Sequence, residues 1–460
     1  MNYPVWEVPY IGTPWVVGII AIFHVMIAHF AVGGGLYLAF AEARAIKQNR
    51  GWLPIIKEHS RFFLLLTGVF GTVSGVGIWF AIGLVQPEAT STLIHNFVFG
   101  WAIEWVLFVV ELSSAAVYYY TWGRVSDKVH IQVGRVYAVS SLLTLVIING
   151  ILTFMLTPGS AWLSVAGTGQ EASRFWYAFF NPTYFPSLFL RILSCLSLAG
   201  VWALVSISRM DDESLGKAKD QLVRWSATWL APSFLLMPFA FWWYMSQVPE
   251  ANRHLLELGM NTIGSGAFTQ VTRIGLITLM TSATIAGIVY FFAYKYPRDL
   301  TFGHAASVLF LALAATGSAE YAREAIRKPY VIGSHMYSTG VRVRDVANFQ
   351  ANGYLTHSMW APQGAVVDEV AEGRLVFRGE CMACHTTDGY RSMRGFLKDR
   401  DEKAIGNVLA MLRDDKPDSP YHAYMPPLAA DPQEIDALKA YLVTLSGVAN
   451  KQPLAAVAQR

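Results

Sequence analysis

The stretch PWVVGIIAIFHVMIAHFAVGGGLYLAFA, residues 14–41, decides the fold class of this chain because it contains no Asp, Glu, Lys or Arg. About 20 apolar residues cross the hydrocarbon core of a bilayer, so this stretch is long enough for a transmembrane helix. Further apolar segments of similar length lie near 62–86, 98–122, 135–157, 184–208, 226–247, 268–294 and 302–326. The sequence therefore predicts an all-α membrane bundle of about eight transmembrane helices within residues 1–330.

The composition supports a membrane protein. The 460 residues are 54% hydrophobic and 15% charged, whereas about a quarter of a soluble domain is charged. A net charge of +3 is too small to suggest a nucleic acid partner, and none is expected. Met1–Tyr10 lacks a basic region, so we expect no cleavable signal peptide, and the first apolar segment should remain as a transmembrane helix.

Basic residues predict the orientation, because loops on the cytoplasmic side are enriched in Lys and Arg. The loop after the first segment carries Arg44, Lys47, Arg50, Lys57 and Arg61, whereas 87–97 carries neither residue type. The loops after the third, fifth and seventh segments are also basic. This pattern predicts a multi-pass protein of the bacterial inner membrane, with its N-terminus and C-terminal region in the periplasm.

A short motif near the end of the chain predicts an electron carrier. Cys381-Met382-Ala383-Cys384-His385 is a C-x-x-C-H run, the signature of covalent c-type haem attachment. The thiols of Cys381 and Cys384 add to the haem, and His385 becomes the proximal iron ligand. A zinc site would need two further Cys or His ligands, and this region offers only His422.

The chain after the last apolar segment divides by its composition. Residues 331–363 are interpreted as a polar linker, 364–450 as a small helical cytochrome c domain and 451–460 as a tail. Met425 precedes two prolines, in a loop before a final helix expected around Gln433–Ser446. This arrangement resembles class I cytochromes c, which implies Met425 as the distal ligand. Alternative distal ligands are His422, Met411, His335 and His357.

Ionisable residues inside the bilayer are functional candidates, because burying them there is costly. The first segment carries His24 and His29, the third Glu104 and Glu111, and the eighth Glu320. The predicted topology places His24, Glu104 and Glu320 in the outer half of the membrane. Glu111 lies nearly two turns deeper than Glu104, on roughly the same helix face.

Simpler interpretations exist for each of these residues. A histidine on an apolar helix is often a core residue. His29 is rotated by more than roughly 100° about the helix axis from His24, so the two cannot easily ligate one iron. Glutamates can join helices as polar pairs, and Glu320 can pair with Arg323. The glycine run Gly33–Gly35 lies in mid-span, where close approach of another helix or of a haem plane explains it.

Residues 14–335 resemble the large subunit of cytochrome bd-type terminal oxidases, in collinear pieces such as FHVMIAHFAVGGG, AIEWVLFVVEL and AEYAREAIRKPYVIG. The resemblance implies that His24 ligates one active-site haem and Glu320 the other. It also implies that Glu104 and Glu111 belong to the proton path, although their spacing is one residue shorter than expected.

Departures from that family are also informative. Arg191 and Gly275 stand where the resemblance places the two ligands of a low-spin haem b, so that haem is expected to be absent. The stretch 248–267 is short where the family has its quinol-oxidising loop, and 326–330 reads IRKPY in place of a family signature. Arg191 and Arg273 are candidate partners of haem propionates, and snorkelling is the alternative.

These observations predict an oxidoreductase, the haem-containing subunit of a bd-like terminal oxidase in a respiratory chain. A periplasmic donor, a cytochrome c or similar protein, would reduce haem c. Two membrane haems, of types b and/or d, would reduce O2 to water, with Glu104, Glu111 and Glu320 acting in the reaction and His29 contacting haem. The resemblance implies a homologous second subunit. The alternatives are a non-oxidase subunit relaying electrons between quinone or membrane haems and periplasmic cytochrome c, and a membrane anchor for haem c.

Overall fold

The computed structural model describes residues 6–210, 212–261, 269–358 and 368–447. The chain forms two compact units. Unit 1 comprises Met1–Ile19, Trp79–Thr92 and Arg327–Arg460, and unit 2 comprises Ile20–Ile78 and Leu93–Ile326. The predicted tail 451–460 lies outside the described residues, as do parts of the predicted linker 331–363, of the predicted cytochrome c domain 364–450 and of the short stretch 248–267.

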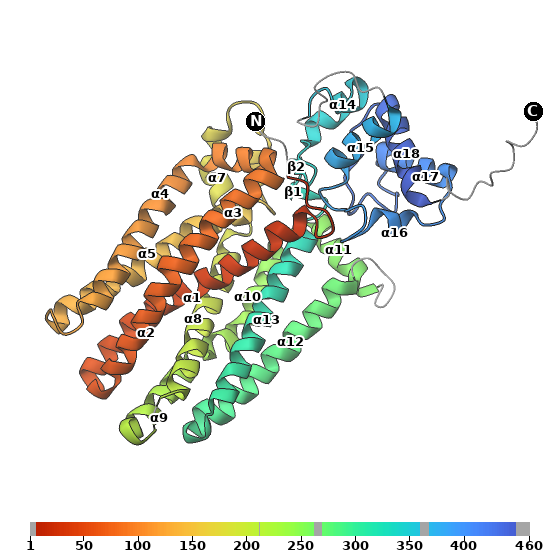
Figure 1. The fold of residues 1–460 in the computed structure, drawn as a ribbon. Helices are drawn as coiled ribbons and strands as arrows, with labels where there is room; N and C mark the ends of the chain where they lie inside the picture. The colour runs from red at the N-terminus through yellow and green to blue at the C-terminus, as the bar shows by residue number, and fades with distance from the viewer. Residues whose placement is uncertain (1–5, 211, 262–268, 359–367, 448–460) are drawn as a thin grey trace, which may run out of the picture. The chain divides into compact units, whose positions relative to one another are not determined.

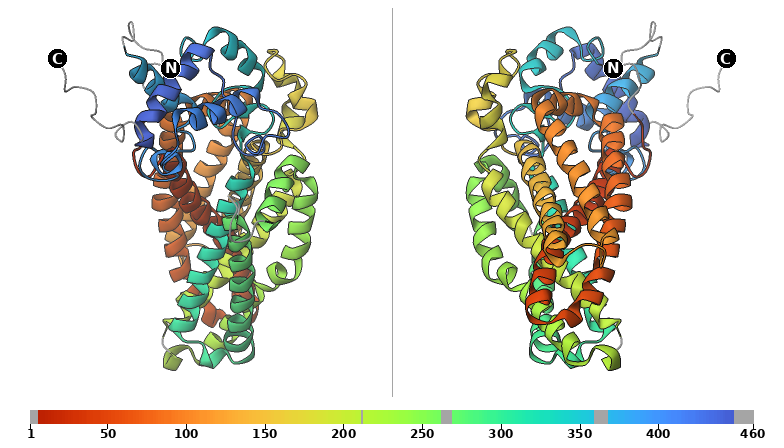
Figure 2. Two further views of the ribbon diagram at one scale, coloured as in Figure 1. Left: turned by 90° about the vertical axis from the view of Figure 1, so that its right-hand side faces the viewer. Right: turned by 90° about the vertical axis from the view of Figure 1, so that its left-hand side faces the viewer.

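Unit 2 is built from long helices that run alongside one another (Figures 1 and 2). Three of them, α1, α3 and α4, have one end in unit 1. The helices are α1 (Thr13–Gln48), α2 (Leu53–Leu65), α3 (Thr72–Val85), α4 (Pro87–Tyr120), α5 (Asp127–Phe154), α8 (Tyr184–Ser208), α9 (Asp212–Thr228), α10 (Ala231–Gln247), α11 (Glu250–Asn261), α12 (Thr269–Ile288) and α13 (Phe302–Ile326). Shorter connecting elements are η1 (Arg50–Trp52), the π-helical turns η2 (Leu66–Gly71) and η4 (Val289–Lys295), α6 (Ser160–Leu163), η3 (Glu171–Arg174), α7 (Phe175–Phe179) and η5 (Pro297–Asp299).

The all-α membrane fold predicted from hydropathy is confirmed. Within the described residues, seven helical stretches are long and apolar enough to cross a membrane: Thr13–Gln48, Arg50–Val85, Pro87–Tyr120, Asp127–Phe154, Tyr184–Ser208, Gly275–Lys295 and Phe302–Glu324. The remaining expected segment, 226–247, mostly forms α10, which has 17 residues. At 1.5 Å per residue α10 measures about 26 Å, just under the roughly 30 Å of a hydrocarbon core.

The glycine run in α1 allows neighbouring helices to approach closely. A Cβ at Gly33 would overlap the backbone carbonyl of Cys195 on α8, and a Cβ at Gly34 would overlap the ring of Phe63 on α2. Only a residue without a side chain fits at these two positions. This confirms close helix approach, one of the two explanations drawn from the sequence.

The C-terminal part of unit 1 is a small helical fold with one two-stranded hairpin. The antiparallel strands β1 (Tyr330–Ile332) and β2 (Met336–Tyr337) pair Tyr330 with Tyr337. The remaining elements are η6 (Val343–Asp345), α14 (Val346–Asn352), α15 (Glu369–Glu380), α16 (Met393–Leu397), α17 (Glu402–Asp414) and α18 (Pro432–Ser446). Helices α15 and α18 cross at Gly373, where a Cβ would overlap the carbonyl oxygen of Ala437.

The predicted final helix is confirmed as α18, and it begins with a capping box formed by Asp431 and Glu434. Glu434 also joins the predicted linker to this fold. Its two carboxylate oxygens accept the backbone N–H groups of Tyr354 and Leu355, at 2.7 Å each. Tyr354 and Leu355 are buried in the same hydrophobic core as Phe377. Part of the stretch interpreted as a linker is therefore folded structure.

Candidate haem sites

The C-x-x-C-H motif follows the last turn of α15 and is held in a tight turn. The N–H groups of Cys384 and His385 donate to the carbonyl of Cys381 at 3.1 and 2.9 Å, and both cysteines are free thiols. His385 Nδ1 lies 3.1 Å from the carbonyl oxygen of Arg391. A carbonyl only accepts, so Nδ1 carries the proton and Nε2 keeps the lone pair that binds iron. Burial lowers the pKa of His385, which favours the neutral imidazole. This set of groups fits haem c.

Met425, the predicted distal ligand, lies in the loop between α17 and α18. Its N–H donates to the carbonyl of Tyr421 at 2.9 Å. Among the rival ligands, His422 is exposed, and its Nδ1 lies 2.7 Å from Asp415 Oδ1. This contact engages Nδ1 of His422 and leaves its Nε2 free among the described residues, so the hydrogen bonds do not separate His422 from Met425. Ligation of iron by Met425 stays a prediction.

Glu320 on α13 is held between two guanidinium groups. Its Oε2 accepts from Arg323 Nε at 2.9 Å, and its Oε1 lies 3.4 Å from Arg191 Nη2. The sequence suggested a pair with Arg323 as the simpler alternative, but not the contribution of Arg191 from α8. Only 7% of Arg191 is exposed. A buried guanidinium therefore sits beside the carboxylate expected to ligate haem.

His29 and His24 on α1 have different surroundings. His29 is 4% exposed, and neither ring nitrogen makes a well-formed hydrogen bond among the described residues, although the backbone of Val25 is a polar neighbour. It also interacts electrostatically with Arg191 and Glu320. A buried ring nitrogen that lacks a well-formed hydrogen bond is unfavourable by about 1–3 kcal/mol. His29 therefore fits contact with a bound group.

The protonation of His24 follows from its hydrogen-bond partner. The hydroxyl of Ser74 donates to the carbonyl of Phe70 at 2.5 Å, so Ser74 Oγ accepts from His24 Nδ1–H at 2.9 Å. This tautomer leaves the Nε2 lone pair available for iron. The donor set fits the haem ligation implied for His24, which stays a prediction.

Glu104 and Glu111 lie seven residues apart on α4. Glu111 is 3% exposed, and its Oε1 accepts from the hydroxyl of Ser141 at 2.8 Å. Glu104 is partly buried and interacts electrostatically with Glu111. Arg273, a predicted propionate partner, is exposed near the start of α12. Ser74 and Ser141, which hydrogen-bond His24 and Glu111, belong to no recognisable sequence motif, so the sequence did not predict them.

Comparisons with known proteins identify the family of the chain and a structure of similar fold. A family model described as cytochrome bd terminal oxidase subunit I matches residues 14–271, and a cytochrome c model matches residues 370–446. The structure of bd oxidase from Geobacillus thermodenitrificans is similar in fold, with a TM-score of 0.57 and 14% identity over 69% of this chain and 87% of that chain. No curated protein sequence matches the chain.

Glu320 lies beyond the residues matched by the first family model. That model nevertheless covers more than half of the 460 residues. The helices and the donor groups of His385 are consistent with both matches. The chain therefore belongs to the cytochrome bd terminal oxidase subunit I family, as a haem-containing, membrane-spanning oxidoreductase subunit with a C-terminal cytochrome c domain.

Proposed function

We propose that this chain is the oxygen-reducing subunit of a bd-like terminal oxidase that receives its electrons through haem c. The observation that carries the proposal is the buried pair of Arg191 with Glu320. Arg191 stands where the family resemblance places a low-spin haem ligand, and a guanidinium, which stays protonated, does not ligate iron. The usual electron route from quinol would then be missing, and the fused haem c supplies a replacement.

The chain's own residues divide the remaining work. His24 and Glu320 would hold two membrane haems, of types b and/or d, with His29 in contact and Arg191 or Arg273 near the propionates. The bound haems supply one-electron chemistry and oxygen binding. Reduction of O2 to two water molecules consumes four electrons and four protons. Glu111 and Glu104 would hold and transfer those protons within the membrane.

The proposal includes an orientation and partners. The distribution of Lys and Arg supports a periplasmic N-terminus and a periplasmic cytochrome c domain. A periplasmic cytochrome c or similar protein would then reduce haem c directly. A second, homologous membrane subunit would complete the complex, by analogy with the family.

The decisive experiment is a redox difference spectrum of the purified protein with and without carbon monoxide, together with oxygen consumption driven by a reduced cytochrome c. We expect one membrane haem to bind carbon monoxide, and oxygen consumption with the cytochrome but not with quinol alone. Replacing His24 with Ala should remove a membrane haem. His95→Ala, at an exposed position on α4, is the matched control.

Two outcomes would overturn the proposal. Membrane haems that are all six-coordinate and bind no carbon monoxide would indicate an electron relay. A pyridine haemochrome assay that detects haem c alone would indicate a membrane anchor.

A further inference from the structure

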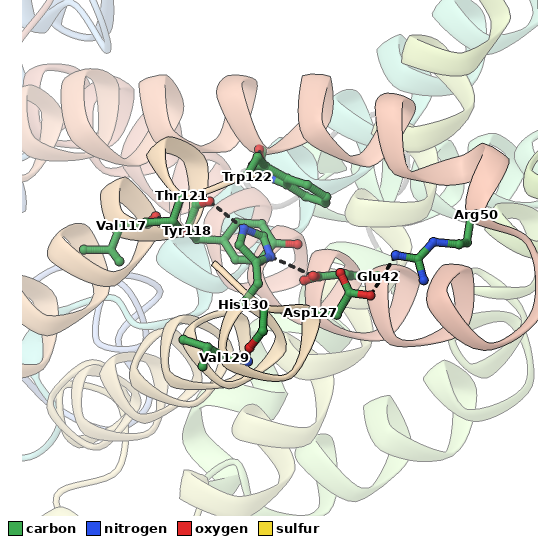
Figure 3. Close-up of polar contacts among 11 residues, drawn as sticks. Glu42, Arg50, Val117, Tyr118, Thr121, Trp122, Asp127, Val129 and His130 are labelled. Atoms are coloured by element: carbon green, nitrogen blue, oxygen red, sulfur yellow. Dashed lines mark hydrogen bonds and ion pairs between the residues drawn. The ribbon is translucent and has the colours of Figure 1, made fainter. Parts of the chain in front are cut away.

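A buried acid–base pair lies in unit 2, apart from the residues assigned above (Figure 3). Glu42 on α1 is 2% exposed and His130 on α5 is 3% exposed, and Glu42 Oε1 lies 2.6 Å from His130 Nδ1. The rings of Tyr118 and Trp122 lie against His130, each with centroids 4.4 Å away. Such groups are costly to bury in a membrane protein, and chains of them serve as proton relays.

The hydrogen bonds of His130 define where its protons reside. His130 Nε2 lies 2.9 Å from the backbone carbonyl of Tyr118. A carbonyl only accepts, so Nε2 carries a proton in every state of the pair. One further proton is shared between His130 Nδ1 and Glu42 Oε1. The second carboxylate oxygen, Oε2, makes no well-formed hydrogen bond in the part of the chain that the structure describes.

The pair lies at one end of a row of polar side chains between α4 and α5. On α4, Glu104, Glu111 and Tyr118 recur every seven residues, which is close to two helical turns. On α5, Tyr137 and Ser141 follow His130 on the same face. Tyr137 interacts electrostatically with Glu111 and with Tyr118. We call these residues the polar column: Glu42, His130, Tyr118, Tyr137, Ser141, Glu111 and Glu104.

Several buried oxygens along the column make no well-formed hydrogen bond to protein. Among the described residues, these are Glu42 Oε2, Tyr118 Oη, Tyr137 Oη and Thr67 Oγ1, all inaccessible to solvent. The side chain of Tyr118 nevertheless interacts with that of Glu42, and the side chain of Tyr137 with that of Thr67. Each unsatisfied buried group costs about 1–3 kcal/mol. Ordered water molecules satisfy such groups in proteins. Thr67 belongs to the π-helical turn η2, and such turns are frequent at functional sites.

The same end of the column approaches solvent-exposed charges. Asp127 lies one turn before His130 on α5, and its Oδ2 lies 2.7 Å from Arg50 Nη2. Both side chains are at least half exposed. Asp127 also interacts electrostatically with His130. Among the described residues, Glu42, Tyr118 and Asp127 thus act on His130, and Arg50 is paired with Asp127. In the orientation proposed above, they lie at the cytoplasmic end.

We propose that Glu42 and His130 form the proton intake of the polar column, which carries protons past Tyr118 and Tyr137 to Glu111. This inference rests on the proposed function, which consumes one proton per electron. A proton from the Asp127 side forms an O–H bond at Glu42 Oε2 while the shared proton remains on His130 Nδ1. That O–H bond then breaks as the proton passes to water beside Tyr118, and the pair returns to its starting state.

The competing explanation is structural, namely that the pair only ties α1 to α5. Removal of either partner would then weaken folding without changing proton transfer. The test compares Glu42→Gln, Glu42→Asp and His130→Asn in the complete protein. Glu58→Gln is the matched control, because Glu58 is an exposed carboxylate on α2 that forms an ion pair with Arg61 at the surface.

The first readout needs no oxygen chemistry. Purified protein is reduced anaerobically, while proton uptake and the infrared C=O band of protonated carboxyl groups are recorded. We expect Glu42→Gln to lose a carboxyl band and to slow proton uptake at least tenfold, with haem content and carbon monoxide binding as in the wild type. Glu42→Asp should retain most of the uptake, and Glu58→Gln all of it.

The second readout is oxygen consumption per haem. Glu42→Gln should lower the rate of oxygen consumption at least tenfold and increase the ratio of the rate in H2O to that in D2O. His130→Asn should change both quantities in the same direction. Unchanged proton uptake and unchanged oxygen consumption per haem in folded Glu42→Gln would refute the proposed proton intake. A variant that loses stability but keeps both rates would refute it as well. If the wild type consumes no oxygen yet Glu42→Gln slows anaerobic proton uptake, the proposed function fails while the intake stands.

Discussion

The carboxylate of Glu434 offers a prediction whose size follows from its hydrogen bonds. Glu434 is 4% exposed. Its Oε2 accepts the N–H groups of Tyr354 at 2.7 Å and Asp431 at 3.0 Å, and its Oε1 accepts that of Leu355 at 2.7 Å. A hydrogen bond to a charged group contributes about 1.5–3 kcal/mol. Three such bonds, with partial relaxation, make Glu434→Ala destabilising by about 4 kcal/mol.

Glu434→Gln distinguishes the contributions of these hydrogen bonds. In Glu434→Gln the amide oxygen can take the position of Oε2 and keep the bonds to Tyr354 and Asp431. The amide nitrogen then faces the N–H of Leu355, so one bond is lost and two donors meet. We therefore expect a loss of about 2 kcal/mol, half that of the alanine variant.

The assay is urea unfolding of the complete protein in detergent, followed by the absorbance of covalently attached haem c. Glu369→Gln, an exposed carboxylate in the first turn of α15, is the control and should change stability by under about 0.5 kcal/mol. Equal effects of Glu434→Gln and Glu369→Gln would refute the reasoning, because the buried hydrogen bonds would then contribute nothing.

Three further predictions concern the same domain. Burial raises the pKa of Glu380 from 4.5 to about 8. Glu380 stays protonated in the folded protein but ionises in the unfolded chain, so the free energy of unfolding falls as pH rises from about 4.5 to 8, by about 3 kcal/mol at pH 7. Glu380→Gln should abolish this pH dependence in urea unfolding measured at several pH values. Gly373→Ala should prevent close crossing of α15 and α18 and lower the yield of folded haem c protein, whereas Gly406→Ala, whose Cβ would lie 3.6 Å from the nearest side chain, should be neutral or stabilising by up to about 1 kcal/mol. Met425→Leu should lower the reduction potential of haem c in a potentiometric titration, because thioether ligation raises it.

Each of these predictions has a contrary result. A pH slope that persists in Glu380→Gln would assign it to another group. Equal yields of folded protein for the alanine variants at Gly373 and Gly406 would contradict the crossing argument. An unchanged potential in Met425→Leu would point to one of the other candidate ligands.

The membrane fold and the haem c motif could be predicted from the sequence because both depend on short-range information. An apolar run such as 14–41 must become a helix in a bilayer, where every backbone polar group needs an internal partner. The capping box of Asp431 and Glu434 is likewise read from four consecutive residues. The sequence did not indicate that much of the predicted linker is folded, because its strands and helix are short and its buried side chains, such as Tyr354, pack against residues far along the chain.

What the tertiary structure alone decided are the polar contacts between distant segments. Hydropathy places Arg191 and Glu320 in separate spans, and nothing in either segment indicates that they pair. Glu42 and His130 are 88 residues apart and look like unremarkable residues near the ends of two spans. Their functional meaning arises only when α1, α4 and α5 bury them together, because the same groups in water would be solvated separately and would share no proton.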